Sequence, residues 1–374
     1  MVERAWREAA IDLGAITRNV ERMRELTGTE HFIAVVKADA YGHGAVPSAR
    51  AALTGGADWL GVADVAEALE LRAAGIDAPI LAWLHDPIDD FTVALAARVS
   101  VGISSPAQLQ AVADAAARAR AGAASVQLKL DTGLSRNGIP EPQWERAFEA
   151  AREAERAGLV RVDGIFSHVS NASVAHDEAA VRKLDRGLAL ATQAGLTPSL
   201  RHIAATTAAL TVPSARYNTV RIGIGMYGLS PLEGRSSADL GLTPAMTLRS
   251  RVAGVRRVPA GTGVSYGYTY WTDADTTLAL IPLGYADGVP RGASNGGPVQ
   301  IGGRIFRVSG RIAMDQFVVD VGEHPVAVGD EVVLFGDPAQ GMPSAEQWAA
   351  AADTINYEII ARIGGRVTRT YVGG

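Results

Sequence analysis

The 374-residue sequence contains no cysteine, which excludes a disulfide framework, a thiolate metal site and a cysteine nucleophile. It has no apolar run long enough to span a bilayer, and its first residues, MVERAWREAAIDL, carry charges where a signal peptide requires an apolar core. The net charge of -5 and the lack of a long basic run argue against nucleic acid or an anionic membrane as a partner. These absences predict a soluble, cytoplasmic protein, and we expect no metal site.

The first part of the chain alternates between strand-like and helix-like segments. The strand candidates are 32–37, 58–62, 79–83, 99–103, 125–130, 162–168, 199–203 and 219–222, and the helix candidates include 14–27, 65–74, 106–120, 141–157 and 178–194. Eight strands alternating with helices predict a closed parallel β/α barrel of the TIM type. An open doubly wound sheet is the alternative. The count of eight and the lack of an early GxGxxG turn favour the barrel.

The pattern changes after about residue 240. Strand-like segments separated by Gly, Pro and Asp turns follow one another, with one helix late in the chain; the strands are 246–258, 277–282, 298–301, 304–308, 316–321 and 331–335, and the helix is 344–352. This pattern predicts a C-terminal all-β domain. We therefore divide the chain into a barrel, 1–240, and a mainly β domain, 241–374, with residues 1–13 as a candidate addition to the latter.

One lysine stands at the end of a predicted buried strand. The apolar run 32–36 stops at Lys37, and we expect a loop containing Tyr41 to follow. A partly desolvated amine loses proton affinity, and a neutral amine can form a Schiff base with an aldehyde. The alternative is an ordinary solvated lysine that happens to end a strand.

Other polar residues follow the same pattern. The carboxyl ends of barrel strands line active sites, and here they carry Lys37, Tyr41, Lys129, Asp131, Arg136, His168, His202, Thr206 and Arg221. A glycine turn at 223–225 and the helix start at Thr206 have the features of a phosphate cup. An amine combined with a phosphate cup suggests pyridoxal 5'-phosphate as the cofactor. We interpret His43 and His202 as loop or packing residues.

Seven motifs occur in order along almost the whole chain: AVVKADAYGHG, LDTGLSRNG, VRIGIGMYGLSP, GVSYGYTY, IPLGYADGVPR, GRIAMDQ and TINYEI. Together they closely resemble the bacterial alanine racemase family. The resemblance implies a pyridoxal-phosphate enzyme that interconverts L- and D-alanine and supplies D-alanine for peptidoglycan. It also implies a head-to-tail homodimer in which each active site combines one barrel with the partner's β domain.

The resemblance assigns two acid/base groups. Lys37 matches the lysine that carries the cofactor and serves the D face of the substrate, and Tyr266 matches the tyrosine that comes from the second subunit and serves the L face. Racemisation removes a proton from one face of the α carbon and returns one to the other. A pair of groups on separate parts of the chain suits this requirement, and each is typically worth about 10²–10⁴-fold in rate.

The resemblance also assigns the cofactor contacts. The phosphate-binding positions match Tyr41, Thr206, Gly223, Ile224 and Tyr357. His168 matches the histidine beside the cofactor ring, and Arg221 matches the arginine facing the pyridine nitrogen. An arginine there does not give up its proton, so the ring nitrogen stays unprotonated, which favours racemisation over transamination or decarboxylation. The alternative for Arg221 is a structural pair with a carboxylate.

The remaining assignments concern the substrate and its surroundings. Arg136 and Met314 match contacts to the substrate carboxylate, and Lys129 matches a lysine that is often carbamylated and then positions Arg136. Without that modification, Lys129 is expected to pair with Asp131. Tyr285 and Asp315 match second-subunit residues around the access channel.

Two positions depart from the family pattern. Ala205 stands where the family usually has asparagine, and Ala313 stands where many members have cysteine. Ala205 cannot replace the hydrogen bonds of an asparagine amide, so weaker cofactor binding or altered binding of analogues is expected, and Ala313 leaves more room at the entrance. The two departures keep open a broader alanine/serine racemase. Another pyridoxal-phosphate barrel enzyme, such as a decarboxylase, and a non-catalytic binder of cofactor or antibiotic are further alternatives. A binder is expected to lack one of the two bases, whereas this chain has both.

Overall fold

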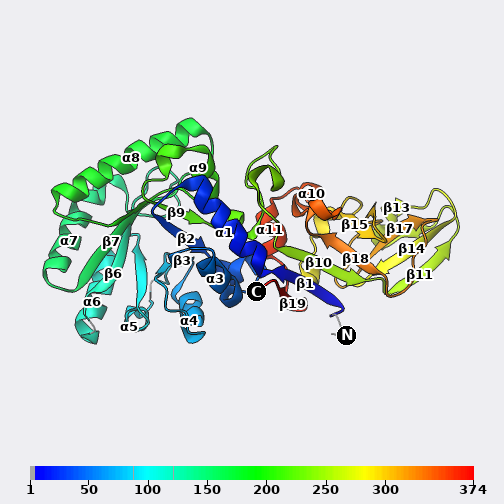
Figure 1. Cartoon of the computed structure of the whole chain (residues 1–374), viewed down its shortest axis with the longest axis horizontal. Coiled ribbons are helices and arrows are strands. Elements are labelled where there is room, and N and C mark those ends of the chain that lie inside the picture. Colours follow the sequence, from blue (N-terminus) through cyan, green and yellow to red (C-terminus); the bar gives the residue numbers. More distant parts are fainter. Residues whose placement is uncertain (1–4, 87, 121) are drawn as a thin grey trace.

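The computed structural model describes residues 5–86, 88–120 and 122–374, and it has two lobes (Figure 1). The first lobe is an eight-stranded sheet in the order β8-β7-β6-β5-β4-β3-β2-β9, with every neighbouring pair parallel. Its strands are β2 His31–Val35, β3 Trp59–Val62, β4 Ile80–Ala82, β5 Val99–Ile103, β6 Ala124–Lys129, β7 Val160–Phe166, β8 Leu200–His202 and β9 Thr219–Ile222. They coincide with the eight predicted strands to within about two residues at each end.

The sheet closes on itself between β8 and β9. The backbone N–H of Arg221 in β9 donates to the carbonyl oxygen of Ala204, just after β8, over 3.1 Å. The strands are apolar and buried on both faces, as in β5, where every residue is buried. The predicted barrel is therefore confirmed, and the open doubly wound alternative is wrong.

Helices surround the barrel. They are α1 Leu13–Thr27, α3 Ala45–Thr54, α4 Val65–Ala73, α5 Phe91–Ala96, α6 Pro106–Ala119, α7 Trp144–Arg156, α8 Val174–Gln193 and α9 Thr206–Thr211. Their ends follow local sequence signals. Asp12 accepts a hydrogen bond from the N–H of Ala15 at the start of α1, and Gly28 ends that helix in the left-handed conformation. In the part of the chain that the structure describes, no helix has the length and apolar character needed to cross a membrane.

The second lobe is built mainly from antiparallel strands. A six-stranded sheet runs in the order β16-β15-β18-β10-β1-β19, and smaller sheets contain β11-β14-β17 and β12-β13. The strands are β1 Arg7–Asp12, β10 Met246–Arg251, β11 Gly254–Val258, β12 Gly263–Val264, β13 Tyr270–Trp271, β14 Thr276–Ile281, β15 Pro298–Ile301, β16 Arg304–Arg307, β17 Phe317–Gly322, β18 Glu331–Phe335 and β19 Thr368–Val372. The amino-terminal β1 thus lies between β10 and β19, far in sequence from both.

Two details differ from expectation. The segment 246–258 is not one strand, because the chain leaves the large sheet after β10 and enters the small one at β11. The lobe also contains two helices, α10 Ala345–Ala351, which was predicted, and α11 Asn356–Ala361, which was not. In Figure 1, α11 lies between the barrel and the β sheets. The side-chain amide of Asn356 donates to the carbonyl oxygen of Ser230 over 2.8 Å, so α11 is fastened to the end of the barrel chain.

Candidate active site

A cavity of about 770 Å³ opens at the carboxyl ends of the barrel strands. The barrel and α11 both line it. Its lining includes seven residues predicted from the sequence: Lys37, Tyr41, Lys129, Arg136, His168, Arg221 and Tyr357. Four of these seven residues are lysines or arginines, and Glu358 is the one carboxylate in the lining. The cavity therefore attracts anions, as a phosphorylated cofactor and an amino-acid carboxylate require.

Lys37 follows β2, but the segment after it is not a loop. Residues Ala38–Tyr41 form a turn of left-handed helix with φ between 51° and 54°, closed by a 2.9 Å hydrogen bond from the N–H of Gly44 to the carbonyl of Asp39. Left-handed helix costs roughly 1–2 kcal/mol per non-glycine residue, so this turn persists because its surroundings hold it. Burial, and then the charge of Arg136, lower the pKa of Lys37. The structure therefore favours the neutral, nucleophilic form of the amine more than bulk water does.

Arg221 is buried at the centre of a hydrogen-bonded chain. Its Nη1 donates to Nδ1 of His202 over 2.7 Å, and Nε2 of His202 lies 2.7 Å from Oε1 of Gln127. Because Arg221 can only donate, His202 accepts through Nδ1 and carries its proton on Nε2. His202 is thus a link in the site and not a packing residue alone, which corrects the interpretation made from the sequence.

The partners of Arg221 among the described residues are neutral. Its Nη2 donates to the carbonyls of Ser167 at 2.8 Å and Ile203 at 3.1 Å, and to Nδ1 of His168 at 3.0 Å. Burial, followed by the charge of Arg136, lowers the pKa of Arg221 to about 10. Burial and the neighbouring arginines lower the pKa of His168 to about 3, so that ring is neutral near pH 7. The alternative of a carboxylate partner for Arg221 is not realised, and its positive charge is left for a ligand.

Lys129 also lies among cations. Its Nζ is 5.7 Å from the ring centre of Phe166, and burial followed by the charge of Arg221 lowers its pKa to about 7. The Asp131 carboxylate accepts hydrogen bonds from the backbone N–H groups of Gly133 and Ser135. Asp131 therefore shapes the loop that carries Arg136, and the expected Lys129–Asp131 pair is not formed.

The residues expected to hold a phosphate gather at one side of the cavity. A Cβ atom on Gly223 would stand 2.4 Å from the hydroxyl oxygen of Tyr41, so only glycine allows this approach. The N–H of Gly223 donates to the hydroxyl of Thr206 over 3.2 Å, and the rings of Tyr41 and Tyr357 are 6.2 Å apart. Thr206, Gly223 and Ile224 are buried and are not among the residues that line the cavity, whereas Tyr41 and Tyr357 line it. Hydroxyl and N–H groups fit the phosphate of pyridoxal phosphate, and the nearby amine of Lys37 fits its aldehyde.

The other predicted residues lie in the β lobe, outside the lining of this cavity. Tyr266 is 69% exposed in the turn between β12 and β13, and Met314 and Tyr285 are 53% and 40% exposed. Asp315 pairs with Arg366 over 2.7 Å. Figure 1 shows β13 at the end of this lobe far from the barrel. Within one chain, Lys37 and Tyr266 are therefore on separate surfaces.

Comparison with known proteins identifies the family of both lobes. Residues 11–231 match the family described as alanine racemase, N-terminal domain, and residues 245–371 match alanine racemase, C-terminal domain. The chain belongs to the alanine racemase family. It is 50% identical over 372 residues to the alanine racemase of Thermobifida fusca, covering 99% of both chains.

Solved structures of alanine racemases share the fold. The enzyme from D-cycloserine-producing Streptomyces lavendulae superposes with a TM-score of 0.97 at 47% identity, covering 100% of this chain and 98% of that one. The alanine racemase of Bacillus anthracis with bound L-Ala-P superposes with a TM-score of 0.87 at 32% identity, covering 100% and 97%. The similarity extends through both lobes.

The two departures from the alanine racemase pattern occupy distinct places. Ala205 lines the Lys37 cavity and precedes α9 without a side-chain cap. Ala313 lines a pocket in the β lobe together with Tyr266, and its carbonyl accepts from the N–H of Tyr285 over 3.1 Å. A larger side chain at Ala205 would narrow the Lys37 cavity, and a larger one at Ala313 would narrow the pocket beside Tyr266.

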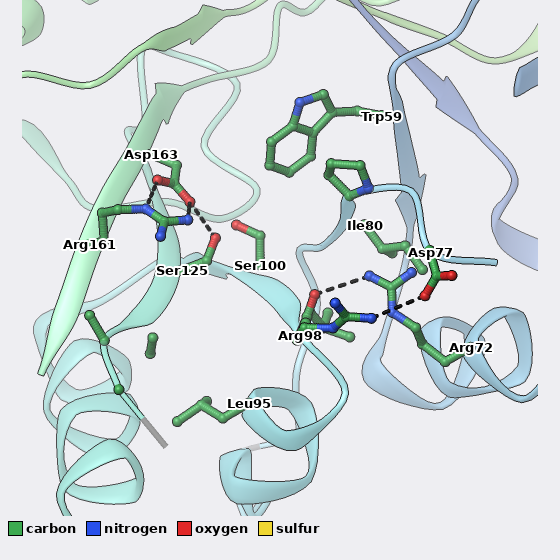
Figure 2. A pocket seen from close by; sticks show the side chains of 15 residues that line it. Trp59, Arg72, Asp77, Ile80, Leu95, Arg98, Ser100, Ser125, Arg161 and Asp163 are labelled. Atoms are coloured by element: carbon green, nitrogen blue, oxygen red, sulfur yellow. Dashed lines mark hydrogen bonds and ion pairs between the residues drawn. The ribbon is translucent and has the colours of Figure 1, made fainter. Parts of the chain in front are cut away.

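A second pocket of about 360 Å³ lies at the opposite, amino-terminal ends of the barrel strands (Figure 2). It contains three arginines, and Figure 2 shows that two of them, Arg98 and Arg161, face carboxylates. Arg161 and Asp163 form an ion pair, and Arg98 lies 3.0 Å from Asp77. Arg72 donates to backbone carbonyls, including that of Ile76 at 2.6 Å. Two of the three arginines are thus paired with carboxylates, whereas the lining of the Lys37 cavity has four cationic side chains and one carboxylate.

Proposed function

We propose that the protein interconverts L-alanine and D-alanine with pyridoxal 5'-phosphate, in the cytoplasm, and supplies D-alanine for peptidoglycan. The observation that carries this proposal is the Lys37 cavity, in which a desolvated amine lies among cationic side chains that outnumber the carboxylates. When bound, the cofactor supplies an electron sink for the negative charge at the substrate α carbon. The chain's own residues bind, orient and move protons.

Lys37 is the residue that would hold the cofactor aldehyde and act on one face of the α carbon. Burial lowers the pKa of Lys37, which favours the neutral amine, the form that accepts a proton and can later return it. Tyr41, Thr206, Gly223, Ile224 and Tyr357 would hold the phosphate. Burial raises the pKa of Tyr41 and raises that of Tyr357 to about 12, so both hydroxyls keep their protons and can donate to a phosphate.

Arg221 would face the pyridine nitrogen, with His168 beside the ring. The chain Arg221–His202–Gln127 fixes the guanidinium, which stays protonated at a pKa of about 10. A donor of this kind leaves the ring nitrogen unprotonated and limits how much charge the ring absorbs. That limit favours return of the proton to the α carbon, which is what racemisation needs.

Arg136 and Met314 would contact the substrate carboxylate, with Lys129 supporting Arg136. Lys129 has a pKa of about 7, so a substantial fraction of its amine is neutral at physiological pH. A neutral amine is the form that reacts with carbon dioxide to give a carbamate. The carbamate would carry negative charge into a cluster of cations, where it could pair with Arg136.

Tyr266 would be the acid/base group for the opposite face, contributed by a second copy of the chain. Its exposure on the β lobe, away from the Lys37 cavity, supports a head-to-tail homodimer. In this arrangement the barrel, residues 1–240, holds the cofactor, and residues 241–374 complete the partner's site. Tyr285 and Asp315 would line the access to the site from the same lobe.

The test is a time course that starts from pure L-alanine in heavy water, with L-serine run in parallel. Convergence to equal amounts of both enantiomers, each with α-deuterium, is the expected result. Comparable turnover of serine would extend the activity to a broader racemase, for which the small side chains of Ala205 and Ala313 leave room. α-Deuterium without D-alanine would contradict the two-base assignment, and no exchange by cofactor-loaded protein would contradict the proposed activity.

A further inference from the structure

Glu67 uses its carboxylate in an unusual way for its position in a helix. It is the third residue of α4, where the side chain of Asp64 accepts from its N–H over 3.0 Å. A glutamate at this position ordinarily turns back to the N–H of the capping residue. Here Oε1 accepts from the N–H of Ala38 and Oε2 from the N–H of Ala63, each over 2.7 Å. One carboxylate thus joins the segments that follow β2 and β3.

Ala38 is the residue after Lys37 and the first residue of the left-handed turn. Four consecutive left-handed residues that are not glycine require external restraint. The far side of the turn is held by Asp39, whose Oδ1 accepts from the N–H of Ala45 over 2.8 Å, and by Arg369, whose Nε donates to the carbonyl of Gly42 over 2.9 Å. Glu67 holds the side nearest the lysine.

Glu67 also acts on the charge of Lys37. Arg136, on the loop after β6, and Arg221, in β9, disfavour protonation of the amine, and Lys129, in β6, is a further cation in the same cavity. His168, after β7, is neutral. The ring of Trp83, after β4, lies 6.0 Å from Nζ. The Glu67 carboxylate opposes these cations and favours the protonated form.

We propose that Glu67 is a positioning residue for Lys37. Its carboxylate fixes the start of the left-handed turn, and thereby the direction of the amine, and it supplies the negative charge that offsets the neighbouring cations while that amine gains and loses a proton. The inference rests on the proposed role of Lys37 as the cofactor-bearing base.

The substitutions Glu67→Gln and Glu67→Ala separate the two parts of this role. Glutamine keeps the size but loses the charge, and it can accept at one N–H while its own NH₂ faces the other. Alanine loses both acceptors. Glu70→Gln is the matched control, because Glu70 is exposed on the same helix and an identical charge is removed.

Two readouts are measured on full-length protein whose fold is verified by circular dichroism. The first is the pH midpoint for trace acetylation of Lys37 in cofactor-free protein, followed by mass spectrometry. The second is the rate at which that protein captures pyridoxal phosphate. Glu67→Gln should lower the midpoint by about 0.5–1 pH unit, less than the 1–3 units expected of a pair in direct contact.

Glu67→Ala should lower the midpoint similarly and slow capture about tenfold, since two N–H groups lose their acceptor. Glu70→Gln should change neither readout by more than the experimental error. An unchanged midpoint in Glu67→Gln overturns the proposal, as does wild-type capture by Glu67→Ala. Should Glu67→Ala fail to fold, the midpoint of Glu67→Gln still decides.

Borohydride reduction of the wild-type holoenzyme separates this inference from the proposed function. Peptide mapping should find the reduced cofactor on Lys37. If it does and Glu67→Gln behaves as wild type, the role of Glu67 alone is wrong. Attachment at another lysine overturns both assignments.

Discussion

The barrel has an arginine-containing pocket at each end, and the two differ in how their charges are satisfied. At the amino-terminal end, Arg161 pairs with Asp163 and Arg98 with Asp77, as Figure 2 shows. At the carboxyl end, Arg221 donates to neutral histidines and carbonyls. The amino-terminal pocket has two carboxylates for its three arginines, whereas the lining of the Lys37 cavity has one carboxylate for four cationic side chains, which leaves a stronger positive field for a ligand. The balance of charge over the whole lining therefore distinguishes the amino-terminal, structural end of the barrel from the carboxyl-terminal, functional end.

The largest predicted effect is a loss of racemisation rate when Arg221, the buried arginine at the carboxyl end of the barrel, is replaced. Arg221→Gln removes a charge and leaves Nδ1 of His202 without its donor. Loss of one preorganised donor commonly costs about 10²–10³-fold in turnover. Initial rates of racemisation at saturating alanine measure this loss. A rate within threefold of wild type would show that the uncompensated charge is not used.

The next largest effect is a dependence of stability on pH near the same end. Burial lowers the pKa of His43 to about 4, against an ordinary value near 6.5, and the ring stacks on Tyr227. As pH falls from about 6.5 to 4, His43 binds a proton in the unfolded chain but not in the folded chain. The free energy of unfolding therefore falls by roughly 3 kcal/mol over this range.

Urea unfolding at a series of pH values measures this effect, and His43→Gln is the comparison variant. The variant should lose less stability than wild type across the acid range. Parallel losses in the two proteins would assign the acid sensitivity to other groups.

At the structural end, Arg72→Met should reduce stability without reducing catalysis. Arg72 donates to the carbonyls of Ile76, Ala78, Ala97 and Arg98. Because methionine cannot donate these hydrogen bonds, the free energy of unfolding should fall by roughly 2 kcal/mol. Thermal unfolding and the turnover number at 25 °C together test this. A fall in turnover before any unfolding would contradict the division between the two ends.

The smallest predicted effect concerns substrate binding. Arg136→Gln should raise KM for alanine about tenfold, because a charge-assisted contact to the carboxylate is weakened. Arg98→Gln removes an arginine from the other pocket and should leave KM unchanged within twofold. Steady-state kinetics of both variants provide the matched comparison. Equal changes in KM in the two variants would contradict a substrate site at the carboxyl end of the barrel alone.

The barrel and its strand ends were predictable because their signals are local. Apolar runs such as 32–36 mark buried strands, and the polar residues at or just after their carboxyl ends, including Lys37 and Arg221, fall at one end of a parallel barrel by geometry. The left-handed turn after Lys37 was missed because Ala38 and its neighbours have no intrinsic preference for that backbone; tertiary hydrogen bonds impose it. The break after Arg251 was missed because the apolar alternation continues across it.

Other features depend on contacts between distant segments. The position of His202 at a strand end was visible in the sequence, but its role as a link was not, since its partners Gln127 and Arg221 come from two other strands. The glutamine was not considered from the sequence, although it stands in β6 two positions before Lys129. The partnership of Lys37 with Tyr266 is a prediction from the family resemblance and concerns two copies of the chain.

The most direct test of the composite site is subunit mixing. Lys37→Ala and Tyr266→Phe variants, each inactive alone, are dissociated together, reassociated in equal amounts and assayed for racemisation. In a head-to-tail dimer, half of the dimers are mixed and each restores one of its two sites, so about a quarter of wild-type activity should return. No recovery, with mixed dimers shown by mass spectrometry, would contradict a site built from two chains.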